Sequence, residues 1–447
     1  MAKLIVINVG TEHALGLDWS SAHPIARSVW RSAWLAEEGD VLVSPVPFDP
    51  GFLEYVGHTL GIDMGTVGVV TRSRPLTDDE LRSPGLVAEL RAHVERGAIT
   101  SSTSCFSTEG TAELALALGL APAEHRFAAE GGGVLLNRKT HFRQLAAGLG
   151  LPLAPGRTVH SPSALAAAVR ELLVHTGTVI LKKDDGAGGM GNVTITTEEP
   201  GPLPGSSQTR HVDEGIDALA SELYPRLGEP AGGGLVVEAY FRAAHMFYLE
   251  YRVGADGRPR FLDSGTIRLR PDRDPDAPAL VWVGLDIPAE VPSYSLCRAL
   301  GHATELVLLA ARLGYRGHVN VDAIVTDAGQ LVFNEINGRW GGGLVLHAIA
   351  SRLLGEGHAD VCCLSSLREV DSPPRREALR ILEREGLHFD PRSREGAIVV
   401  SCDEARSGTM ECMVIGPSRA RARQLEDRLR AALGRPEIAR VRSRAIS

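Results

Sequence analysis

Residues 331–343, LVFNEINGRWGGG, place a carboxylate, an amide and a guanidinium at alternate positions after an apolar, strand-like run. The three groups belong to Glu335, Asn337 and Arg339. Alternate residues of a strand share one face, so we predict that these side chains point the same way as Phe333. Such a set could hold a metal ion or an anionic ligand. For Glu335 and Asn337 alone, a solvent-exposed polar face is an equally good interpretation.

A second run, HVNVDAIV at residues 318–325, carries Asn320 and Asp322. The connection TDAGQ predicts a hairpin with a two-residue or a four-residue loop, and either loop places Asp322 opposite Glu335 and Asn320 opposite Asn337. Two facing carboxylates are unfavourable unless a cation lies between them. Oxygen-only ligands favour Mg²⁺ over zinc, and a Mg²⁺ ion with few protein ligands leaves positions for phosphates.

A glycine-rich stretch, VILKKDDGAGGMGNVTIT at residues 179–196, contains a G-x-G-x-x-G pattern. A dinucleotide-binding site would need a helix after the last glycine, but the β-branched run NVTIT predicts a strand. A P-loop pattern is also absent. The stretch therefore predicts a strand–loop–strand hairpin with Lys182 at its entrance, whose backbone N–H groups could cradle phosphate oxygens. A flexible surface hairpin is the competing interpretation.

The elements around these motifs predict a chain of several domains, because 447 residues exceed one ordinary core. Residues 1–125 alternate extended and helical patterns and predict a small α/β domain. We place a second domain at 126–365, divided at 205/206, and a small α+β domain at 366–447. Helices are expected at 83–97, 111–120, 137–150, 161–175, 296–314 and 418–433. Strands are expected at 4–9, 178–182, 235–241, 246–253, 259–270, 318–325, 331–337, 396–401 and 409–416, and a surface loop at 200–210.

The composition excludes several classes of protein. A formal charge of −8 argues against nucleic acid as the main partner, and the basic stretch from Arg419 to Arg444 is expected to be a solvated helix face. None of the six cysteines forms a C-x-x-C pair, which indicates buried, reduced thiols in a cytoplasmic protein. Neither a signal peptide nor an apolar run of about 20 residues is present, so we expect no membrane segment.

In their order along the chain, these motifs resemble the ATP-grasp family over about residues 126–350. The matching features are a helix lysine, a strand lysine before a glycine-rich hairpin, the strand V-V-E-x-x-x, and D-x12-E-x-N. The resemblance implies an ATP-grasp fold, with an α/β pre-ATP-grasp domain before it and a small α+β domain after it. It also implies ATP and Mg²⁺ as cofactors.

The resemblance assigns roles to individual residues. Lys139 and Lys182 would contact the nucleotide phosphates, with Lys183 as a competitor for Lys182. Asp322, Glu335 and Asn337 would hold two Mg²⁺ ions. The phosphate loop would include Gly186, Gly188, Gly189 and Gly191, and the adenine hinge would include Glu238, Ala239 and Phe241.

Two positions depart from the family pattern. His245 stands where the related ligases carry an acid that binds the ribose, so the ribose contact at this position is in doubt. Asn320 stands where they carry an arginine two residues before the metal aspartate. Arg268 or Arg270, on the preceding strand, is expected to supply this cation near the γ-phosphate; a surface position for either arginine is the alternative.

The flanking segments and N-E-I-N-G-R-W-G-G-G at 334–343 resemble the pheganomycin-type peptide ligases of actinomycetes. This resemblance implies antibiotic biosynthesis: an amino-acid-like carboxylate, N-modified or guanidino, would be joined to the α-amine of a peptide. An acyl phosphate would form, Arg339 would stabilise it, and ADP and Pi would be released. An ATP-grasp kinase and a non-catalytic ATP-binding regulator are the alternatives. SSTSCFS at 101–107 is expected to be a capped loop rather than a substrate site, and a homodimer is the default assembly.

Overall fold

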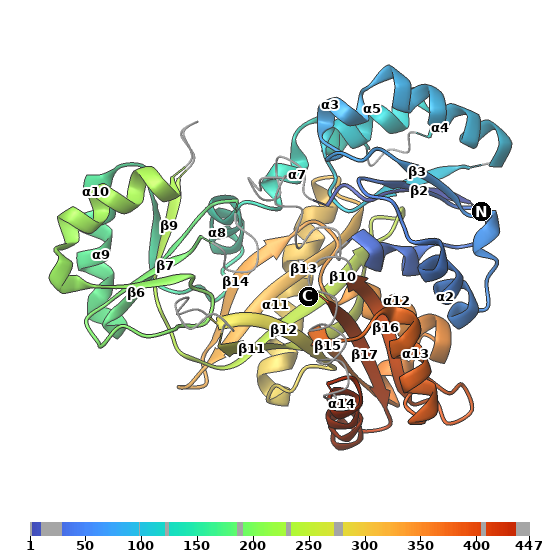
Figure 1. The fold of residues 1–447 in the computed structure, drawn as a ribbon. Coiled ribbons are helices and arrows are strands. Elements are labelled where there is room, and N and C mark those ends of the chain that lie inside the picture. The colour runs from blue at the N-terminus through green and yellow to red at the C-terminus, as the bar shows by residue number, and fades with distance from the viewer. Residues whose placement is uncertain are drawn as a thin grey trace, which may run out of the picture.

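The computed structural model describes residues 2–9, 29–97, 99–120, 125–185, 191–228, 234–271, 280–403 and 408–434. Within these ranges, strands form a four-stranded, a five-stranded and an eight-stranded sheet. Figure 1 shows the five-stranded sheet on the left and the four-stranded sheet at the upper right of the eight-stranded one. The predicted α/β class is confirmed.

The N-terminal sheet is parallel and has the strand order β3-β2-β1-β4. Its connecting helices cover both faces, as buried parallel strands require. The expectation that SSTSCFS is a capped loop is only partly correct, because its first four residues form β4; its last three lead to Thr108, whose side chain caps the next helix. The elements are β1 (Lys3–Val6), η2 (Arg31–Leu35), β2 (Val41–Ser44), α2 (Pro50–Leu60), η3 (Met64–Thr66), β3 (Gly68–Thr71), α3 (Asp78–Leu81), α4 (Pro84–Gly97), β4 (Ser101–Ser104) and α5 (Glu109–Ala117).

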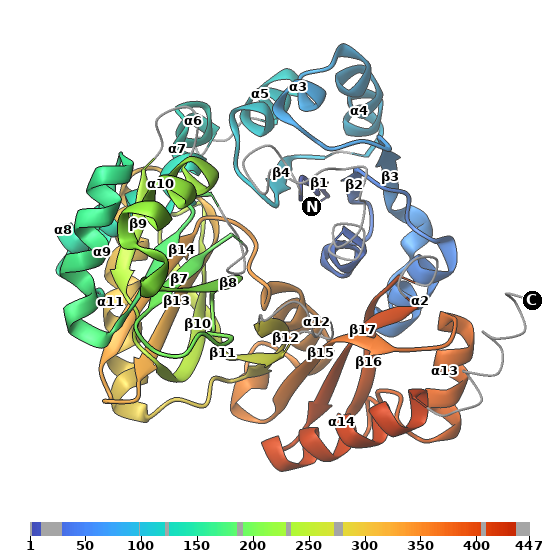
Figure 2. The same ribbon diagram turned by 60° about the vertical axis from the view of Figure 1, so that its left-hand side comes forward.

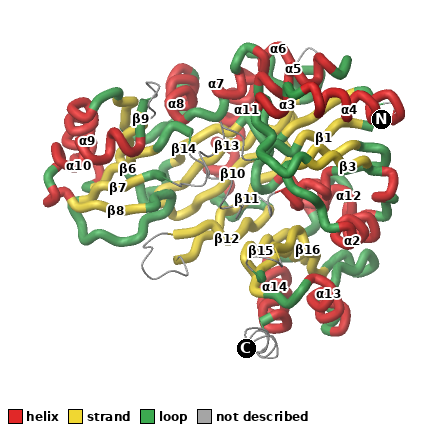
Figure 3. Tube along the Cα trace, turned by 45° about the horizontal axis from the view of Figure 1, so that its top comes forward, coloured by secondary structure: helices red, strands yellow, loops and turns green. Residues whose placement is uncertain are grey.

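The five-stranded sheet has the order β5-β9-β6-β7-β8. Helices α9 and α10 pack on its outer face, away from the eight-stranded sheet (Figure 3). The loop expected at 200–210 is only partly a loop, because it runs into β8. The elements are α6 (His125–Ala129), α7 (Gly132–Leu135), α8 (Lys139–Gly148), β5 (Gly156–Val159), α9 (Pro162–Thr176), β6 (Thr178–Lys182), β7 (Val193–Thr196), β8 (Gln208–His211), η4 (Val212–Glu214), α10 (Ile216–Leu227) and β9 (Leu235–Ala239).

The eight-stranded sheet has the order β14-β13-β10-β11-β12-β15-β17-β16. It continues without interruption into the C-terminal strands, so position 365/366 falls inside β15 rather than between two sheets. The elements are β10 (Ala243–Val253), β11 (Pro259–Pro271), β12 (Leu280–Ile287), α11 (Ser293–Arg312), β13 (Gly317–Thr326), β14 (Leu331–Asn337), α12 (Leu344–Leu354), η5 (His358–Asp360), β15 (Cys363–Asp371), α13 (Arg375–Arg384), β16 (Gly396–Asp403), β17 (Thr409–Gly416) and α14 (Arg419–Leu433).

The hairpin of β13 and β14 has the predicted pairing at its functional end, where Asp322 lies opposite Glu335 and Asn320 opposite Asn337. The predicted turn is wrong, because Thr326 N–H donates to the carbonyl of Gln330 and leaves a three-residue loop. A β-bulge between these two ends restores the expected pairing. The bulge also turns Phe333 into the core, whereas it was predicted to share a face with Glu335.

The largest core joins the two ends of the chain. It contains Trp34 and Phe52 from the N-terminal domain, Ile349 from α12, and Ile398 and Met413 from the C-terminal strands. Figure 2 shows the N-terminal domain and the C-terminal strands meeting on the same side of the molecule. None of the described helices is long and apolar enough to span a bilayer.

Candidate active site

A cleft lies between the five-stranded and eight-stranded sheets, with a cavity volume of about 280 Å³. Its charged side chains come from both walls: two lysines from α8 and β6 face the acidic groups of β13 and β14. An apolar cluster of Ala154, Ile324 and Val332, with Phe241 and Met246 beside it, also lines the cleft. The cleft therefore offers a charged and an apolar surface within one cavity, as a ligand with an anionic part and a flat apolar part requires.

The facing carboxylates of Asp322 and Glu335 both lie close to the side-chain amide of Asn337. Asn337 Nδ2 lies 3.4 Å from Asp322 Oδ2 and 3.3 Å from Glu335 Oε1. The amide oxygen, Asn337 Oδ1, accepts a hydrogen bond of 2.9 Å from Arg339 Nη2. Three oxygen-bearing side chains thus converge in one place, with no nitrogen or sulfur ligand among them. This donor set fits Mg²⁺.

The electrostatics of the pair also favour a cation. Burial and then the neighbouring Glu335 carboxylate raise the pKa of Asp322 well above its usual range. Burial acts on Glu335 too, but the charges of Lys139 and Arg339 and the hydrogen bonds to Asp322 and Asn337 together outweigh it and lower the pKa of Glu335. The nearest positive charge, Lys139 Nζ, is 3.3 Å from Glu335 Oε2. A bound cation would stabilise both carboxylates in their charged form.

The two lysines predicted to contact phosphates both line the cleft. Lys139 begins α8, whose first turn is held by Asp184: Thr140 N–H donates to Asp184 Oδ1 at 2.8 Å. Lys182 ends β6 and is buried. Its competitor, Lys183, is not among the lining residues and pairs with Asp185 at 3.1 Å. The structure therefore favours Lys182 over Lys183.

Glu238 fixes the position of Lys182. Its carboxylate is buried and lies 2.6 Å from Lys182 Nζ and 2.5 Å from Arg143 Nη1. Arg143 in turn donates to the carbonyls of Ala154 and Gly156. Both carboxylate oxygens of Glu238 therefore already have cationic partners.

The hinge residues Ala239 and Phe241 both line the cleft. The N–H of Ala239 donates to the carbonyl of Pro155 at 2.8 Å. In an antiparallel ladder the opposite residue would return a second bond, but proline has no N–H. The carbonyl of Ala239 is therefore left without its ladder partner. Among the described residues, no backbone group accepts from the N–H of Phe241. One acceptor and one donor are thus available at the hinge.

Not all of the predicted residues can be placed in the cleft. Gly186, Gly188 and Gly189 fall outside the described residues; Gly191 is described and has a φ of +85°. His245 is not among the lining residues, whereas its neighbour Met246 is.

The structure does not bring Arg268 and Arg270 to the cleft. Their strand neighbours Ile267 and Leu269 line it, so the two arginines point to the other face of β11. Arg268 binds Glu426 of α14, with Nη1–Oε distances of 2.8 and 3.0 Å. Arg270 pairs with Glu369 at 2.9 Å. The cation expected from either residue near a γ-phosphate is therefore absent, because both guanidinium groups hold the C-terminal elements.

Among the residues that the structure describes, Arg339 is the arginine that lines the cleft. Its guanidinium lies 5.5 Å from the ring centroid of Phe106, a residue of the N-terminal domain. The next residue, Trp340, donates its N–H to the carbonyl of Cys105 at 3.2 Å. The N-terminal domain thus contacts the segment that follows β14. Burial raises the pKa of Cys105 to about 12, which excludes it as a thiolate nucleophile.

The glycines after Trp340 allow close packing beneath the cleft. A Cβ atom on Gly341 would clash with the carboxylate of Glu250, and one on Gly343 would clash with the hydroxyl of Tyr248. This packing explains why the strand gives way to glycine.

A second, smaller cavity of about 90 Å³ lies between the N-terminal domain and the α7–α8 segment. It is lined by Phe106, Ser107 and Thr108 on one side and by Asn137 and Arg138 on the other. It therefore places the end of SSTSCFS next to polar groups, close to where Phe106 contacts Arg339.

Sequence reasoning missed several lining residues. Asn192 hydrogen-bonds the N–H of Lys183 at 3.2 Å and the carbonyl of Gly205 at 3.0 Å, so it ties the loop after β7 to the end of β6. Asn334 reaches the cleft only because of the bulge in β14. Tyr248 was read as part of a strand, and nothing in its local pattern marked it as a lining residue.

Two segments of the chain match models of known domains. Residues 29–120 match the Pre ATP-grasp domain, and residues 377–429 match the PGM1 C-terminal domain. No curated protein matches the chain in sequence.

Solved structures show the same fold over nearly the whole chain. N5-carboxyaminoimidazole ribonucleotide synthetase from Thermus thermophilus is 15% identical with a TM-score of 0.57, covering 97% of this chain and 99% of that one. Biotin carboxylase from Campylobacter jejuni is 12% identical with a TM-score of 0.56, covering 94% and 88%. L-Amino acid ligase from Bacillus licheniformis is 11% identical with a TM-score of 0.51, covering 96% and 97%. The chain therefore has the ATP-grasp fold, preceded by a pre-ATP-grasp domain.

Proposed function

We propose that this chain is an ATP-dependent carboxylate–amine ligase of the ATP-grasp family. The observation that carries the proposal is a single cleft lined by three features. These are the lysines of α8 and β6, the oxygen-bearing side chains of β13 and β14, and an apolar cluster beside the carbonyl of Ala239, which lacks its ladder partner. Three of the structurally similar proteins, a synthetase, a carboxylase and an amino acid ligase, support this class.

The described residues support binding of the adenine, the phosphates and the metal of Mg-ATP. The adenine would lie on the apolar cluster, accepting from the N–H of Phe241 and donating to the carbonyl of Ala239. Lys139 and Lys182 would contact the phosphates. Asp322, Glu335 and Asn337 would hold Mg²⁺, which, when bound, neutralises charge on the transferred phosphoryl group.

The chemical step that we propose activates a carboxylate. A carboxylate oxygen attacks the γ-phosphorus, the bond to the bridging oxygen breaks, and ADP leaves. The guanidinium of Arg339 is placed to stabilise the resulting acyl phosphate, because Asn337 and Phe106 hold it at the end of the metal-binding strand. The amine then attacks the carbonyl carbon, and phosphate leaves with one of the original carboxylate oxygens.

We further propose that the carboxylate belongs to an amino-acid-like molecule, N-modified or guanidino, and that the amine is the α-amine of a peptide. The resemblance to the pheganomycin-type ligases supports these substrates and a role in antibiotic biosynthesis. The small cavity beside Phe106 is a candidate acceptor subsite, since it opens near Arg339. The proposed substrates rest on the resemblance to the pheganomycin-type ligases, whereas the proposed ligase chemistry rests on the residues of the cleft.

We also propose a cytoplasmic enzyme that forms a homodimer. Cys105, Cys362, Cys402 and Cys412 are buried and form no disulfide, as expected for reduced thiols, although Cys297 is exposed and Cys363 is half-buried, which corrects the expectation that all six are buried. Gel filtration with light scattering would test the dimer.

The proposal is tested with hydroxylamine as a surrogate amine, across a panel of amino and guanidino acids. With Mg²⁺ and ATP, the enzyme should form hydroxamate, ADP and Pi in equal amounts for the acids that it accepts. Glu335→Gln keeps the shape of the side chain but removes a charged metal ligand. We expect it to lower all three rates by at least about 10²-fold.

Two outcomes would contradict the proposal. ADP together with a stable phosphorylated product, without hydroxamate, would indicate a kinase. ATP binding without ADP formation for any acid would indicate a regulator that uses the fold for binding alone.

A further inference from the structure

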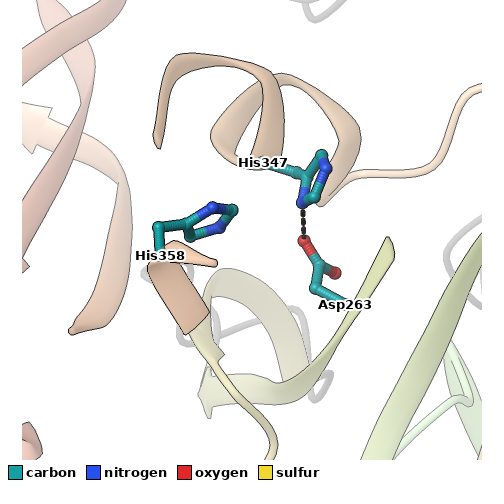
Figure 4. Close-up of side chains that lie close together, drawn as sticks. All are labelled: Asp263, His347 and His358. Atoms are coloured by element: carbon teal, nitrogen blue, oxygen red, sulfur yellow. Dashed lines mark ion pairs between the residues drawn. The ribbon is translucent and has the colours of Figure 1, made fainter. Parts of the chain in front are cut away.

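A second group of ligand-type side chains lies behind the cleft wall. Asp263 comes from β11, His347 from α12 and His358 from η5, and Figure 4 shows the carboxylate and both rings pointing toward one another. Their ligand atoms all lie within 4.8 Å of one another. The three residues are 2%, 8% and 1% exposed. Nothing in the chemistry proposed above uses them.

The cluster lies at the end of a polar row that crosses the sheet. Asn337 pairs with Asn320, Asn320 with Glu250, and Glu250 with Asp263. Cross-strand partners share a face, so Asp263 lies on the same face as the magnesium ligands but two strands further on from Asn320. It is a separate group, because none of its three members lines the cleft.

The hydrogen bonds leave one nitrogen of each ring directed at the centre of the cluster. Ser351 Oγ lies 3.3 Å from His347 Nε2 and 3.4 Å from His358 Nδ1. His358 Nδ1 is also 3.2 Å from the carbonyl of Gly355. One serine therefore orients both rings through the nitrogens that face away, as the outer partners of metal-binding histidines do.

The side-chain atoms that face the centre of the cluster are those that would bind a metal. His347 Nδ1 lies 3.0 Å from Asp263 Oδ2, close to the separation of about 3.3 Å that two ligands have around a tetrahedral ion with bonds of about 2.0–2.1 Å. His358 Nε2 and both carboxylate oxygens of Asp263 are buried without a hydrogen bond. A plain His347–Asp263 hydrogen bond would still leave His358 Nε2 and one carboxylate oxygen without partners.

The surrounding charge also favours a cation. Asp263 and Glu250 are directly opposed, buried carboxylates, which is unfavourable without positive charge between them. Among the described residues, no lysine or arginine forms an ion pair with either of them. The buried hydroxyl of Tyr248 lies close to Asp263.

We propose that Asp263, His347 and His358 bind one divalent transition-metal ion of the zinc type, separate from the magnesium site. Two imidazoles and one carboxylate suit such ions, whereas Mg²⁺ prefers oxygen ligands alone. The ion anchors the first turns of α12 and η5 to β11. Because α12 follows Gly343 directly, the ion also supports the glycine segment over Tyr248 and Glu250.

The test uses the full-length protein, from which metal is removed with a chelator before titration with Zn²⁺ in excess Mg²⁺. Calorimetry measures Zn²⁺ binding, and the melting temperature is recorded with and without Zn²⁺. Wild type should bind one Zn²⁺ and melt at a higher temperature when Zn²⁺ is bound. Two control variants should bind Zn²⁺ as wild type does. Glu335→Gln alters only the magnesium site, and His302→Gln removes a histidine outside the cluster. His358→Gln should lose the Zn²⁺-dependent rise in melting temperature, and Ser351→Ala should weaken Zn²⁺ binding by about 10- to 100-fold.

Cobalt substitution of the wild-type protein keeps the proposal testable if the histidine variants do not fold. Co²⁺ should give ligand-field bands without a thiolate-to-cobalt charge-transfer band. A thiolate band would assign the metal to cysteines such as Cys362, whose Sγ contacts the carbonyl of His358. Three results would overturn the proposal: a thiolate-to-cobalt band, Zn²⁺ binding by His358→Gln that equals that of wild type, or no Zn²⁺ binding by wild type.

Discussion

At the scale of single residues, Lys182 and Lys183 show how strand geometry separates chemically identical side chains. The two lysines are neighbours in sequence, yet Lys182 lines the cleft against Glu238 while Lys183 pairs with Asp185 outside it. Alternation along the end of β6 sends them in different directions. The sequence alone left both as candidates, because alternation tells which residues share a face but not which face meets the ligand.

This difference gives a paired prediction. Lys182→Met should lower ATP turnover by about 10²-fold, because it removes a positive charge from the phosphate contacts. Lys183→Met, the matched control, should change turnover by less than about threefold. Steady-state ADP release measures both, and far-ultraviolet circular dichroism checks that each variant folds. Equal losses in the two variants would contradict the assignment of Lys182.

At the scale of elements, the hinge depends on a proline in the neighbouring strand connection. Pro155 accepts from Ala239 and returns no hydrogen bond, which leaves the carbonyl of Ala239 for a ligand. Pro155→Ala supplies the missing N–H and should compete with adenine for this carbonyl. One hydrogen bond of about 1 kcal/mol corresponds to a roughly fivefold higher Kd for ATP. Calorimetric titration with a non-hydrolysable ATP analogue measures it, and unchanged or tighter binding would argue against the hinge.

The two arginines of β11 provide a second prediction at this scale. Arg268 holds the buried Glu426 of α14, and its removal leaves that carboxylate without its main cation. Arg268→Met should lower the free energy of unfolding by about 3 kcal/mol. Arg270→Met breaks the more exposed pair with Glu369 and should cost less than about 1 kcal/mol. Urea denaturation measures both values.

Measurements of ATP turnover distinguish the structural role of Arg268 from the catalytic role that the resemblance to the family implied. At a temperature where Arg268→Met remains folded, it should retain ATP turnover within about threefold of wild type. A folded Arg268→Met protein without turnover would restore Arg268 as a phosphate contact.

Several elements could be predicted from their own residues, and others could not. The strands with continuous apolar runs and the amphipathic helices, such as α11, were expected near their observed bounds. β15 was missed because it carries buried polar residues: Ser365 hydrogen-bonds Asp286 at 2.7 Å and also contacts Glu426. Its burial comes from tertiary partners far away in the sequence, and no local pattern records them.

The candidate site shows the same division. The carboxylates of β13 and β14 could be paired in advance, because a short hairpin connection fixes which residues face each other. The bulge and the three-residue turn could not be predicted. Each of them shifts the pairing of the strands, and the two shifts cancel at Asp322 and Glu335. The Asp263, His347 and His358 cluster brings together three separate elements, and no spacing rule links them.

At the scale of the whole molecule, the two ends of the chain form one core. Trp34 is fully buried and donates its indole N–H to the carbonyl of Val400 at 2.9 Å, and Arg31 pairs with Glu411. The same N-terminal domain holds the loop after the metal ligands, because Arg31 Nη2 also donates to the carbonyl of Gly342 at 2.7 Å. The active-site loop is thus supported by both ends of the chain.

This shared core predicts the effect of a truncation. A chain of residues 1–365 ends inside β15 and loses Ile398, Met413 and Leu429, which are fully buried against N-terminal residues and their neighbours. We expect it to be insoluble, or to unfold without a cooperative transition, because the N-terminal domain would expose an apolar face. Scanning calorimetry and gel filtration check this. A soluble, cooperatively folded 1–365 chain that turns over ATP would show that the C-terminal segment is an independent appendage.

The central claim is that ATP activates a carboxylate through an acyl phosphate, and oxygen transfer tests it most directly. An acid accepted in the hydroxylamine panel is labelled with ¹⁸O in its carboxylate and incubated with enzyme, Mg²⁺, ATP and an amine. Phosphorus NMR of the released phosphate should show one ¹⁸O atom per Pi, because the carboxylate oxygen stays on phosphorus when the amine displaces it. Unlabelled Pi, or ¹⁸O found in AMP, would contradict this account.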